Sequence, residues 1–570
     1  MNVIGIHNTG ILSSAALVRD GRLEFGCAEE RLDRRKYSKY YPHKAIKACL
    51  DHAGLAMRDV DCFAIGWNPA INIAGRYRAG LSEWPAHPGE RFYANPNHLL
   101  PLMGDLPLVA TDQVFHVDGG KPVTITYVAH HLAHLANAYY LSGFEDAALL
   151  SCDGYGERAS MVWAVGRGGR IETLRTVAFP HSIGAFYSAV TEHLGFRPDL
   201  DEWKVMGAAA YGEPSRYLEA MRRLATVQAD GEFALDLAYF NHFDFDTAGM
   251  LTPAATQLLG ARRRDDEPLD QRHYDLAAAA QAHVENMLFA ILRRLKQETG
   301  LDALCFTGGV AMNSVFNGRA TLDGPFARVY VPFAPDDSGN SIGAALWAAH
   351  RGGDPVAVNG GQATPYLGTA HGDAEIRAAL ERFKLPCTVV DNPAEAAALL
   401  LAEGRIVGWF QGRMEFGQRA LGARSILADP RRADMKDRIN AAVKFREAFR
   451  PFAPAVLAEA VADYFAAPAE ARVPYMEKVF PVRTDKRDVI PAVVHADGTG
   501  RLQTVDAQAQ PDFHALIRAF ARLTGVPVVL NTSFNLNGEP IVESPADAVR
   551  TFMTSGLEAL VIGRHLLRKP

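Results

Sequence analysis

The feature that most constrains this chain is the segment 127–140, Tyr-Val-Ala-His-His-Leu-Ala-His-Leu-Ala-Asn-Ala-Tyr-Tyr, which contains His130 and His134. No turn-forming residue interrupts it, and its alanines and leucines favour a helix. Residues four apart lie on one helix face about one turn apart, so both imidazoles can bind a single metal ion. The alternative interpretation is a buried helix in which each histidine only satisfies its own hydrogen bonds.

Two carboxylates are expected near strand ends. The apolar run 147–152 predicts a buried strand, and Asp153 follows it, where α/β sheets place their functional groups. The strand predicted at 329–332 leads into Asp336 and Asp337 before a glycine-rich helix start. An ordinary N-cap would explain one of these aspartates but not the whole series.

A glycine pair lies between these two carboxylate motifs. The strand predicted at 303–306 enters Gly308-Gly309, and a helix is expected to follow. A strand, a Gly-Gly turn and a helix form a cradle for an anion, because free N–H groups and the positive helix end face it. The sequence therefore predicts a phosphate site close to the candidate metal ligands.

Composition excludes several classes of function. The 570 residues are 48% hydrophobic and carry a net charge of -6, which gives no support for a nucleic-acid or membrane partner. Six scattered cysteines without a C-x-x-C pair indicate reduced thiols rather than disulfides or a zinc site. No apolar run of about 18 residues predicts a transmembrane helix, and we expect a cytoplasmic protein.

The residue composition of the chain changes near residue 365. We predict one α/β domain over 1–365 and a second over 366–570, with insertions at about 67–121 and 213–275. The first insertion is rich in Pro, Gly, Asn and aromatic residues, which is typical of a binding loop, and we interpret it as part of the acceptor site.

The second domain is rich in arginine. Residues 405–450 hold eleven basic and five acidic side chains, in a chain that is acidic overall. Arg413, Arg419 and Arg424 lie among glycines, where arginine forks suit bidentate capture of phosphate or carboxylate. No Walker A loop is present, so a nucleotide would have to be bound by other groups. The strand predicted at 526–530 ends in Asn531-Thr532-Ser533, a polar pocket rim.

Together these motifs resemble the ATP-dependent O-carbamoyltransferases of nodulation-factor and antibiotic biosynthesis (NodU/CmcH type, including the tobramycin enzyme). The resemblance covers nearly the whole chain. It is carried by the phrases at 29–31, 130–134, 204–207, 308–313, 412–417, 449–454, 495–503 and 530–535. It implies a Kae1-like domain of the actin-like ATPase (ASKHA) fold, followed by a YrdC-like α/β domain.

The resemblance also implies a two-step reaction. The second domain would make carbamoyl-adenylate from carbamoyl phosphate and ATP, and the first would transfer the carbamoyl group to a hydroxyl of a small-molecule acceptor. A divalent ion, iron(II) in the characterised relative, would be held by His130, His134, Asp153 and Asp337, and Mg²⁺ would accompany ATP. A homodimer is a further expectation.

The predicted binding residues fall into two groups. Gly308, Gly309, Asn313 and Lys204 are expected at the nucleotide site of the first domain. The second domain's site is expected to use Lys36, Arg413, Arg419, Arg424, Lys444, Arg446, Arg450, Arg501, Asn531 and Ser533. Of these, Lys36 and Arg419 are expected to act in catalysis.

One departure from the family concerns the general base. The family usually has a His-Asp pair where this chain reads Ile11-Leu12. We expect His7, His131 or a loop residue such as His87 to deprotonate the acceptor instead. Alternatively, the acceptor is a more nucleophilic group such as an amine.

Two other functions share parts of this pattern. A tRNA threonylcarbamoyl-type transferase uses the same two folds, but the acidic balance argues against a tRNA partner. A non-catalytic ATP-dependent scaffold of actin-like fold would need neither the arginine-rich domain nor the metal ligands.

Overall fold

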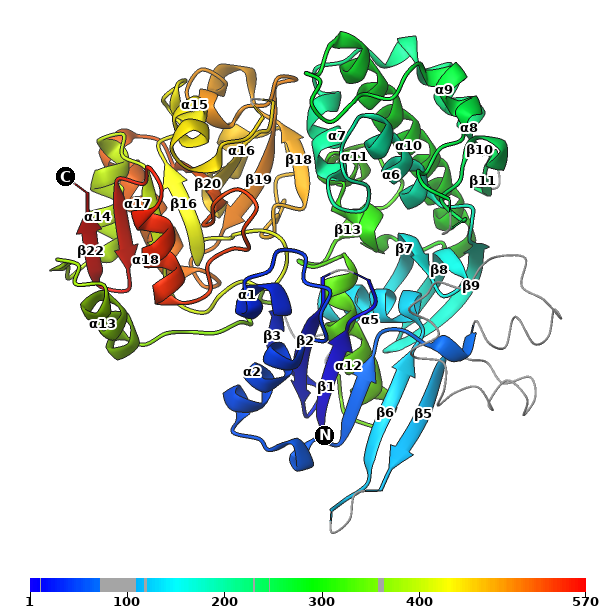
Figure 1. The fold of residues 1–570 in the computed structure, drawn as a ribbon, viewed down its shortest axis with the longest axis horizontal. Coiled ribbons are helices and arrows are strands. Elements are labelled where there is room, and N and C mark those ends of the chain that lie inside the picture. Colours follow the sequence, from blue (N-terminus) through cyan, green and yellow to red (C-terminus); the bar gives the residue numbers. More distant parts are fainter. Residues whose placement is uncertain are drawn as a thin grey trace. The chain divides into compact units, whose positions relative to one another are not determined.

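The computed structural model describes residues 1–10, 12–71, 109–116, 120–228, 231–244, 247–356, 363–447 and 449–569. It contains two compact units (Figure 1). Unit 1 comprises Met1–Gly26, Lys39–Asn313 and Asp323–Ala363, and unit 2 comprises Cys27–Ser38, Ser314–Leu322 and Thr364–Pro570. Both units combine helices and sheets, which confirms the predicted α/β class. Ile11, His87 and most of the expected 67–121 insertion lie outside the described residues.

The first sheet of unit 1 has the strand order β3-β2-β1-β4-β6-β5. Strands β1 to β3 form an antiparallel meander, and β4 and β6 run parallel to β1. Asp20 and Gly21 form the turn between β2 and β3, with positive φ at both residues as a two-residue hairpin turn requires. The strands are β1 (Asn2–His7), β2 (Ser14–Arg19), β3 (Arg22–Ala28), β4 (Cys62–Ile65), β5 (Ala110–Phe115) and β6 (Val123–Val128).

The second sheet of unit 1 repeats this plan. Its order is β13-β12-β7-β8-β9; β7 to β9 form an antiparallel meander, and β12 runs parallel to both β7 and β13. The strands are β7 (Asp146–Gly156), β8 (Ala159–Arg167), β9 (Arg170–Ala178), β12 (Ala303–Thr307) and β13 (Arg328–Tyr330). The two large sheets of unit 1 therefore share one topology over five strands, and β5 is an additional edge strand of the first.

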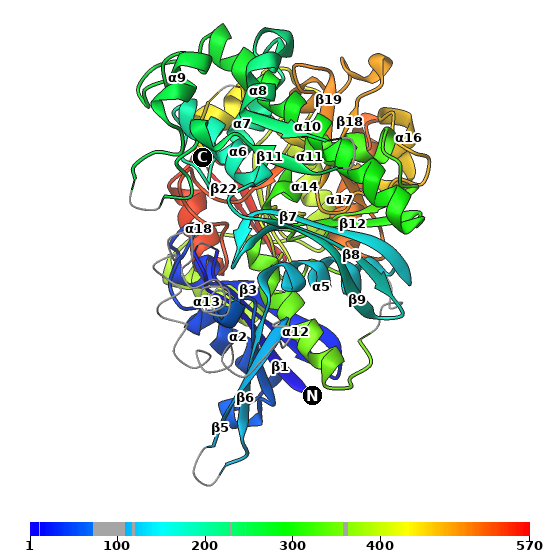
Figure 2. The ribbon, with the colours of Figure 1, turned by 90° about the vertical axis from the view of Figure 1, so that its right-hand side faces the viewer.

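Two helices lie between these sheets (Figure 2). Helix α12 (Asn340–Arg351) packs on β1 and β2, helix α5 (His130–Ser142) packs on β7 and β12, and the two helices pack on each other. Close approach depends on glycine: a Cβ at Gly343 would lie 1.8 Å from the carbonyl oxygen of Ala133, and one at Gly5 would lie 1.7 Å from that of Ser341. This packing brings the start of both helices to the strand ends.

Further helices complete unit 1. The long helix α10 (Gln271–Thr299) contacts α6 (Ile183–His193) and α7 (Glu202–Ala209). The expected 213–275 insertion contains α8 (Leu218–Leu224), β10 (Ala225–Val227), β11 (Phe233–Leu235) and α9 (Pro253–Leu259). No helix among the described residues is long and apolar enough to cross a membrane.

Unit 2 is built on a nine-stranded sheet of order β14-β22-β21-β15-β16-β20-β17-β19-β18. The strands are β14 (Thr388–Val389), β15 (Val407–Phe410), β16 (Arg424–Ala428), β17 (Ala453–Leu457), β18 (Lys478–Pro481), β19 (Thr499–Val505), β20 (Val528–Ser533), β21 (Ala559–Ile562) and β22 (His565–Arg568). Its helices include α13 (Asp373–Arg382), α14 (Pro393–Ala402), α17 (Pro511–Thr524) and α18 (Pro545–Met553).

Two short segments from the first 365 residues belong to unit 2. Helix α1 (Glu29–Asp33) is fixed there because Arg31 Nη2 donates to the carbonyl oxygen of Gly417 at 2.7 Å. Helix α11 (Ser314–Leu322) packs on β18, and a Cβ at Gly318 would lie 1.8 Å from the carbonyl oxygen of Val479. Unit 2 therefore depends on three separate stretches of the chain.

Candidate metal centre and cation cluster

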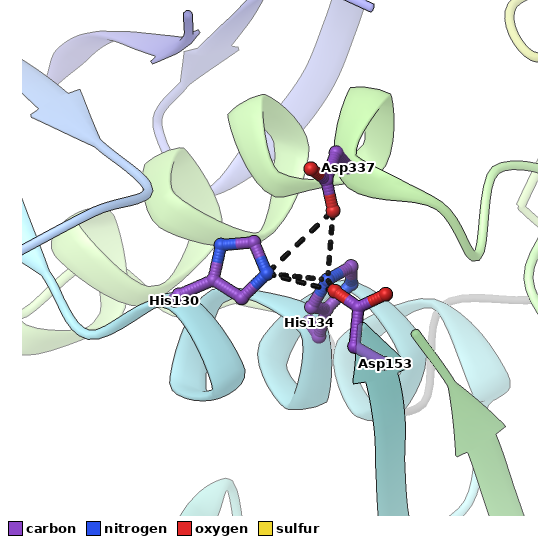
Figure 3. A group of neighbouring side chains, drawn as sticks. All are labelled: His130, His134, Asp153 and Asp337. Carbon is purple, nitrogen blue, oxygen red and sulfur yellow. Dashed lines mark hydrogen bonds and ion pairs between the residues drawn. The ribbon is translucent and has the colours of Figure 1, made fainter. Parts of the chain in front are cut away.

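Four side chains of unit 1 converge from three elements (Figure 3). His130 and His134 lie in the first turns of α5, which confirms the predicted helix. Asp153 lies on β7, within the strand rather than after its end, where the pairing with β8 shifts register. Asp337 begins a 3₁₀ turn just before α12. The register shift is a β-bulge, which re-aims a side chain at a sheet edge.

The geometry of this metal-type quartet matches a divalent cation. The Nε2 atoms of His130 and His134 are 3.1 Å apart, and Asp153 Oδ2 lies 2.9 and 3.1 Å from them. Asp337 Oδ1 lies 3.5 and 3.4 Å from the same two nitrogens. Metal bonds of about 2.0–2.2 Å place neighbouring ligand atoms roughly 3–4 Å apart. Two imidazoles and two carboxylates also provide the donors and charge that such an ion needs.

Electrostatics in the quartet favour a cation. Burial lowers the pKa of His134, but hydrogen bonds to Asp153 and Asp337 and their charges outweigh this and raise it to about 9. The pKa of His130 is raised in the same way. Burial would raise the pKa of Asp153, yet the two histidines hold it well below its usual range. Without a metal ion, protons therefore supply the positive charge that the two carboxylates require.

Three polar contacts hold the quartet in place, and they involve the backbone N–H groups of His130 and Gly309 and the side-chain amide of Asn340. Glu157 Oε1 accepts from the backbone N–H of His130 at 2.9 Å, and Gly309 N–H donates to Asp153 Oδ1 at 2.9 Å. Asn340 Nδ2 lies 3.2 Å from His130 Nδ1, and the buried Asn340 Oδ1 has no partner among the described residues. Turning this amide would let Oδ1 accept from Nδ1–H and leave Nε2 free for a metal.

Sequence reasoning missed Glu157 and Asn340. The available signals were weak: Glu157 follows the Gly154-Tyr155-Gly156 turn, and Asn340 lies three residues after Asp337.

The two histidines expected as a base lie in different environments. His7 is buried at the end of β1, with Nε2 3.6 Å from Asp337 Oδ2. His131 is held between Ser151 Oγ at 2.8 Å and the carbonyl oxygen of Ala159 at 3.1 Å, and burial lowers its pKa to about 3. The structure thus brings His7 to the quartet and leaves His131 in a neutral, structural arrangement.

The expected nucleotide residues of unit 1 have different surroundings. Gly308 has φ +89, and a Cβ there would lie 2.2 Å from the carbonyl oxygen of Cys152, so glycine is needed. The Asn313 amide exchanges two hydrogen bonds with Gln281, at 2.9 and 3.1 Å. Lys204 Nζ lies 3.3 Å from Asp201 and faces the ring of Phe196.

Unit 2 gathers six of the predicted basic residues into what we call the cation cluster: Lys36, Arg419, Lys444, Arg446, Arg450 and Arg501. Burial and then the charges of Arg446, Lys36 and Arg450 lower the pKa of Lys444 well below its usual range. Burial lowers the pKa of Arg446 to about 9, with Arg450 adding to the effect. Such mutual repulsion is typical of a site that is completed by an anionic ligand.

Lys444 and Arg450 have acceptors within unit 2, whereas one donor of Arg501 has none among the described residues. Lys444 Nζ donates to the carbonyl oxygens of Ser533 and Asn535, at 2.6 and 3.0 Å, and to the Asn535 side chain at 2.8 Å. Arg450 pairs with Glu447 at 2.9 Å. Arg501 Nε is buried without a hydrogen-bond partner among the described residues. An orphaned guanidinium donor among cations indicates a place for an acceptor-rich anion.

Other predicted residues of unit 2 serve the fold. Arg424 is buried over the ring of Phe410 and donates to the carbonyl oxygens of Gln411 and Gly412. Arg413 donates to the carbonyl oxygens of Leu367 and Gly368. The Asn531 amide donates to Gln503 Oε1 at 2.8 Å. The structure therefore does not bring these three together with the cation cluster through any described contact.

Comparison with known proteins gives a consistent result along the chain. The family model described as Carbamoyltransferase N-terminus matches residues 2–346, and the one described as Carbamoyltransferase C-terminus matches residues 398–569. The nodulation protein NolNO of Sinorhizobium fredii is 38% identical, over 100% of this chain and 80% of that protein. The uncharacterised protein sll1178 of Synechocystis is 36% identical, over 100% of this chain and 97% of that protein.

Solved structures are more distant. Component A of (R)-2-hydroxyglutaryl-CoA dehydratase from Acidaminococcus fermentans is 12% identical, with a TM-score of 0.32, and covers 62% of this chain and 98% of its own. A score this low carries no argument about the fold.

Proposed function

The chain belongs to the carbamoyltransferase family, and we propose that it makes carbamoyl-adenylate from carbamoyl phosphate and ATP and then carbamoylates a small-molecule acceptor. In this proposal unit 2 is the YrdC-like, adenylate-forming part. Unit 1 is the Kae1-like part of actin-like fold, and its two sheets of matching topology support that assignment.

The cation cluster of unit 2 is the observation that carries the proposal. Carbamoyl phosphate and ATP are both polyanions, so they can meet only where cations offset their repulsion. The charge of Arg446 lowers the pKa of both Lys444 and Arg501. The charge of Arg450 lowers the pKa of both Lys444 and Arg446. Among the described residues, the neighbouring acids do not neutralise all of these cations. The step would also consume one water, and its products would be carbamoyl-adenylate, pyrophosphate and phosphate.

The metal-type quartet supports the transfer step in unit 1. His130, His134, Asp153 and Asp337 would hold a divalent ion, for which we propose iron(II) because mixed imidazole and carboxylate sets suit it. When bound, the ion supplies Lewis acidity toward the adenylate phosphate. The glycines at 308 and 309 allow the backbone to approach that phosphate closely.

His7 is the residue we propose as the proton acceptor for the acceptor hydroxyl. It is buried beside Asp337, whereas both ring nitrogens of His131 are already engaged. We expect His7→Gln to slow carbamoyl transfer while leaving pyrophosphate release unchanged. Equal loss of both activities would contradict this role.

The first step can be tested without knowing the acceptor. The full-length chain is incubated with ATP, carbamoyl phosphate and a divalent metal, and pyrophosphate and carbamoyl-adenylate are measured. We expect pyrophosphate only when both substrates are present, loss of it in Arg501→Met, and its retention in Asp153→Asn. Pyrophosphate release from ATP alone, or none under any condition, would refute the proposal.

A further inference from the structure

Unit 2 contains a second group of reactive side chains that the carbamoyl chemistry does not use. Cys387, His565 and Asp373 are far apart in the sequence but meet beside the edge of the nine-stranded sheet. Cys387 immediately precedes β14, His565 is the first residue of β22, and Asp373 is the first residue of α13. The pairing of β14 with β22 places Val389 opposite His565, which brings the preceding cysteine to the histidine ring.

The distances arrange these residues as nucleophile, base and orienting carboxylate. Cys387 Sγ lies 3.7 Å from His565 Nδ1, and His565 Nε2 lies 2.8 Å from Asp373 Oδ1. An ionised carboxylate only accepts hydrogen bonds, so His565 Nε2 carries a proton that it donates to Asp373. In the neutral ring Nδ1 is then an acceptor, and it faces the thiol. This is the relation of groups that activates a cysteine for attack.

Burial and charge distinguish Cys387 and its two partners from the other cysteines of the chain. The His565 side chain is 3% exposed, so its ring is held by packing, while Cys387 is exposed to solvent. The other five cysteines are all buried. The charged groups around the pair are Arg377, which binds Asp373 Oδ2 at 3.0 Å, and Arg564, which pairs with Asp391 at 2.9 Å. Asp373 is therefore fixed from both sides, and its pKa is lowered first by the hydrogen bond from His565.

We propose that Cys387, His565 and Asp373 form a reactive-thiol site that undergoes exchange with small disulfides. His565 Nδ1 takes the thiol proton, and the Cys387 sulfur attacks one sulfur of the disulfide. The S–S bond of the small molecule breaks, a mixed disulfide forms on Cys387, and the second sulfur leaves as a thiolate that accepts a proton from His565 or water. No electrons are needed beyond those of the disulfide.

The test uses the full-length chain and the aromatic disulfide 5,5′-dithiobis(2-nitrobenzoate), whose released thiolate absorbs visible light. We expect one equivalent to react rapidly, and none to do so in Cys387→Ser. An ordinary thiol with a pKa of about 8.5 reacts roughly two hundred-fold more slowly at pH 6 than at pH 9. For Cys387 we expect less than a tenfold difference between these pH values.

Two variants separate activation from accessibility. Because His565 is buried, Asp373→Asn at the exposed carboxylate is the milder change, and Arg382→Gln, at an exposed residue of the same helix, is its control. We expect at least a fivefold lower rate at pH 6 in Asp373→Asn, a larger loss in His565→Gln, and less than a twofold change in Arg382→Gln. A two hundred-fold pH effect in the wild type, or equal rates in wild type and Asp373→Asn, would overturn the proposal.

Discussion

Arg501 offers a direct test of the cation cluster, because its replacement should stabilise the chain and weaken ligand binding at the same time. Burial and the charges of Arg419 and Arg446 hold its pKa well below the usual range. Methionine keeps the apolar stem and removes the charge. Replacing buried charged groups by apolar ones is often stabilising by about 1–4 kcal/mol. For a unit of this size we expect a gain of about 1–2 kcal/mol, which raises the melting temperature by roughly 2–8 °C.

Ligand binding should change in the opposite direction. A ligand present at one hundred times its Kd stabilises the protein by about 2.7 kcal/mol. A hydrogen bond to a charged group contributes about 1.5–3 kcal/mol, so losing it raises Kd roughly 10- to 100-fold. At the same ligand concentration the stabilisation would then fall to about 0.4–1.4 kcal/mol.

The assay is thermal unfolding of the full-length chain with and without pyrophosphate. The matched control is Arg483→Met, because Arg483 lies in the same unit with 53% of its side chain exposed and only a 3.8 Å contact to Asp485. We expect this control to match the wild type in both measurements. An Arg501→Met variant that melts lower than the wild type, or that keeps the full pyrophosphate shift, would refute the reasoning.

Three further predictions concern the metal-type quartet and the segment 314–322 of unit 2. His134→Ala and Asp153→Asn should each lower the affinity for Fe²⁺ or Co²⁺ by at least tenfold in equilibrium dialysis, whereas His43→Ala, an exposed histidine of the same unit, should not change it. Because Asp153 and its partner carboxylate outweigh the effect of burial and raise the pKa of His134 to about 9, the ion must displace a proton. Metal affinity should therefore rise about tenfold per pH unit up to pH 9, and a flat profile from pH 6 to 9 would count against it. Gly318→Ala should destabilise unit 2 by about 1–3 kcal/mol in denaturant unfolding, because its Cβ would meet a β18 carbonyl oxygen at 1.8 Å. Leu322→Ala, 43% exposed on the same helix, should cost about 1 kcal/mol or less.

The parts of the site that follow from local pattern were predictable from the sequence. The spacing of His130 and His134 is a property of one helix, and Asp153 follows an apolar run that marks a buried strand in the sequence. Asn340 and Glu157 could not be found in this way, because their roles depend on how α5 meets α12 and β7 in space. The same holds for the segment 314–322, which carries no compositional mark of the unit that it joins, but not for 27–38, whose basic run includes Lys36, a residue expected at the second domain's site.

The arginines show why residue type alone does not identify a binding group. Arg424 and Arg501 look alike in the sequence, each within a glycine-containing stretch. The Nη1 and Nη2 groups of Arg424 donate to backbone carbonyl oxygens, and its guanidinium stacks on the Phe410 ring. The protein itself therefore solvates the charge of Arg424. The Nε of each arginine is buried without a partner among the described residues, but Arg501 lies among other cations, Arg419 and Arg446. The partners of each guanidinium, which only the fold determines, decide whether a ligand is needed.

The duplicated topology of unit 1 accounts for the composition of the metal-type quartet. In the first repeat β6 leads to the start of α5, which carries His130, and in the second β13 leads to the start of α12, which follows Asp337. The first strands correspond as well: Asp153 precedes Gly156 by three residues near the end of β7, and His7 precedes Gly10 by three residues at the end of β1. Equivalent positions in two sheets of the same order converge where the crossover helices meet. His7 therefore occupies the position in the first repeat that Asp153 occupies in the second. A histidine at that position keeps an imidazole at this edge even though the His-Asp pair expected at 11–12 is replaced by Ile-Leu.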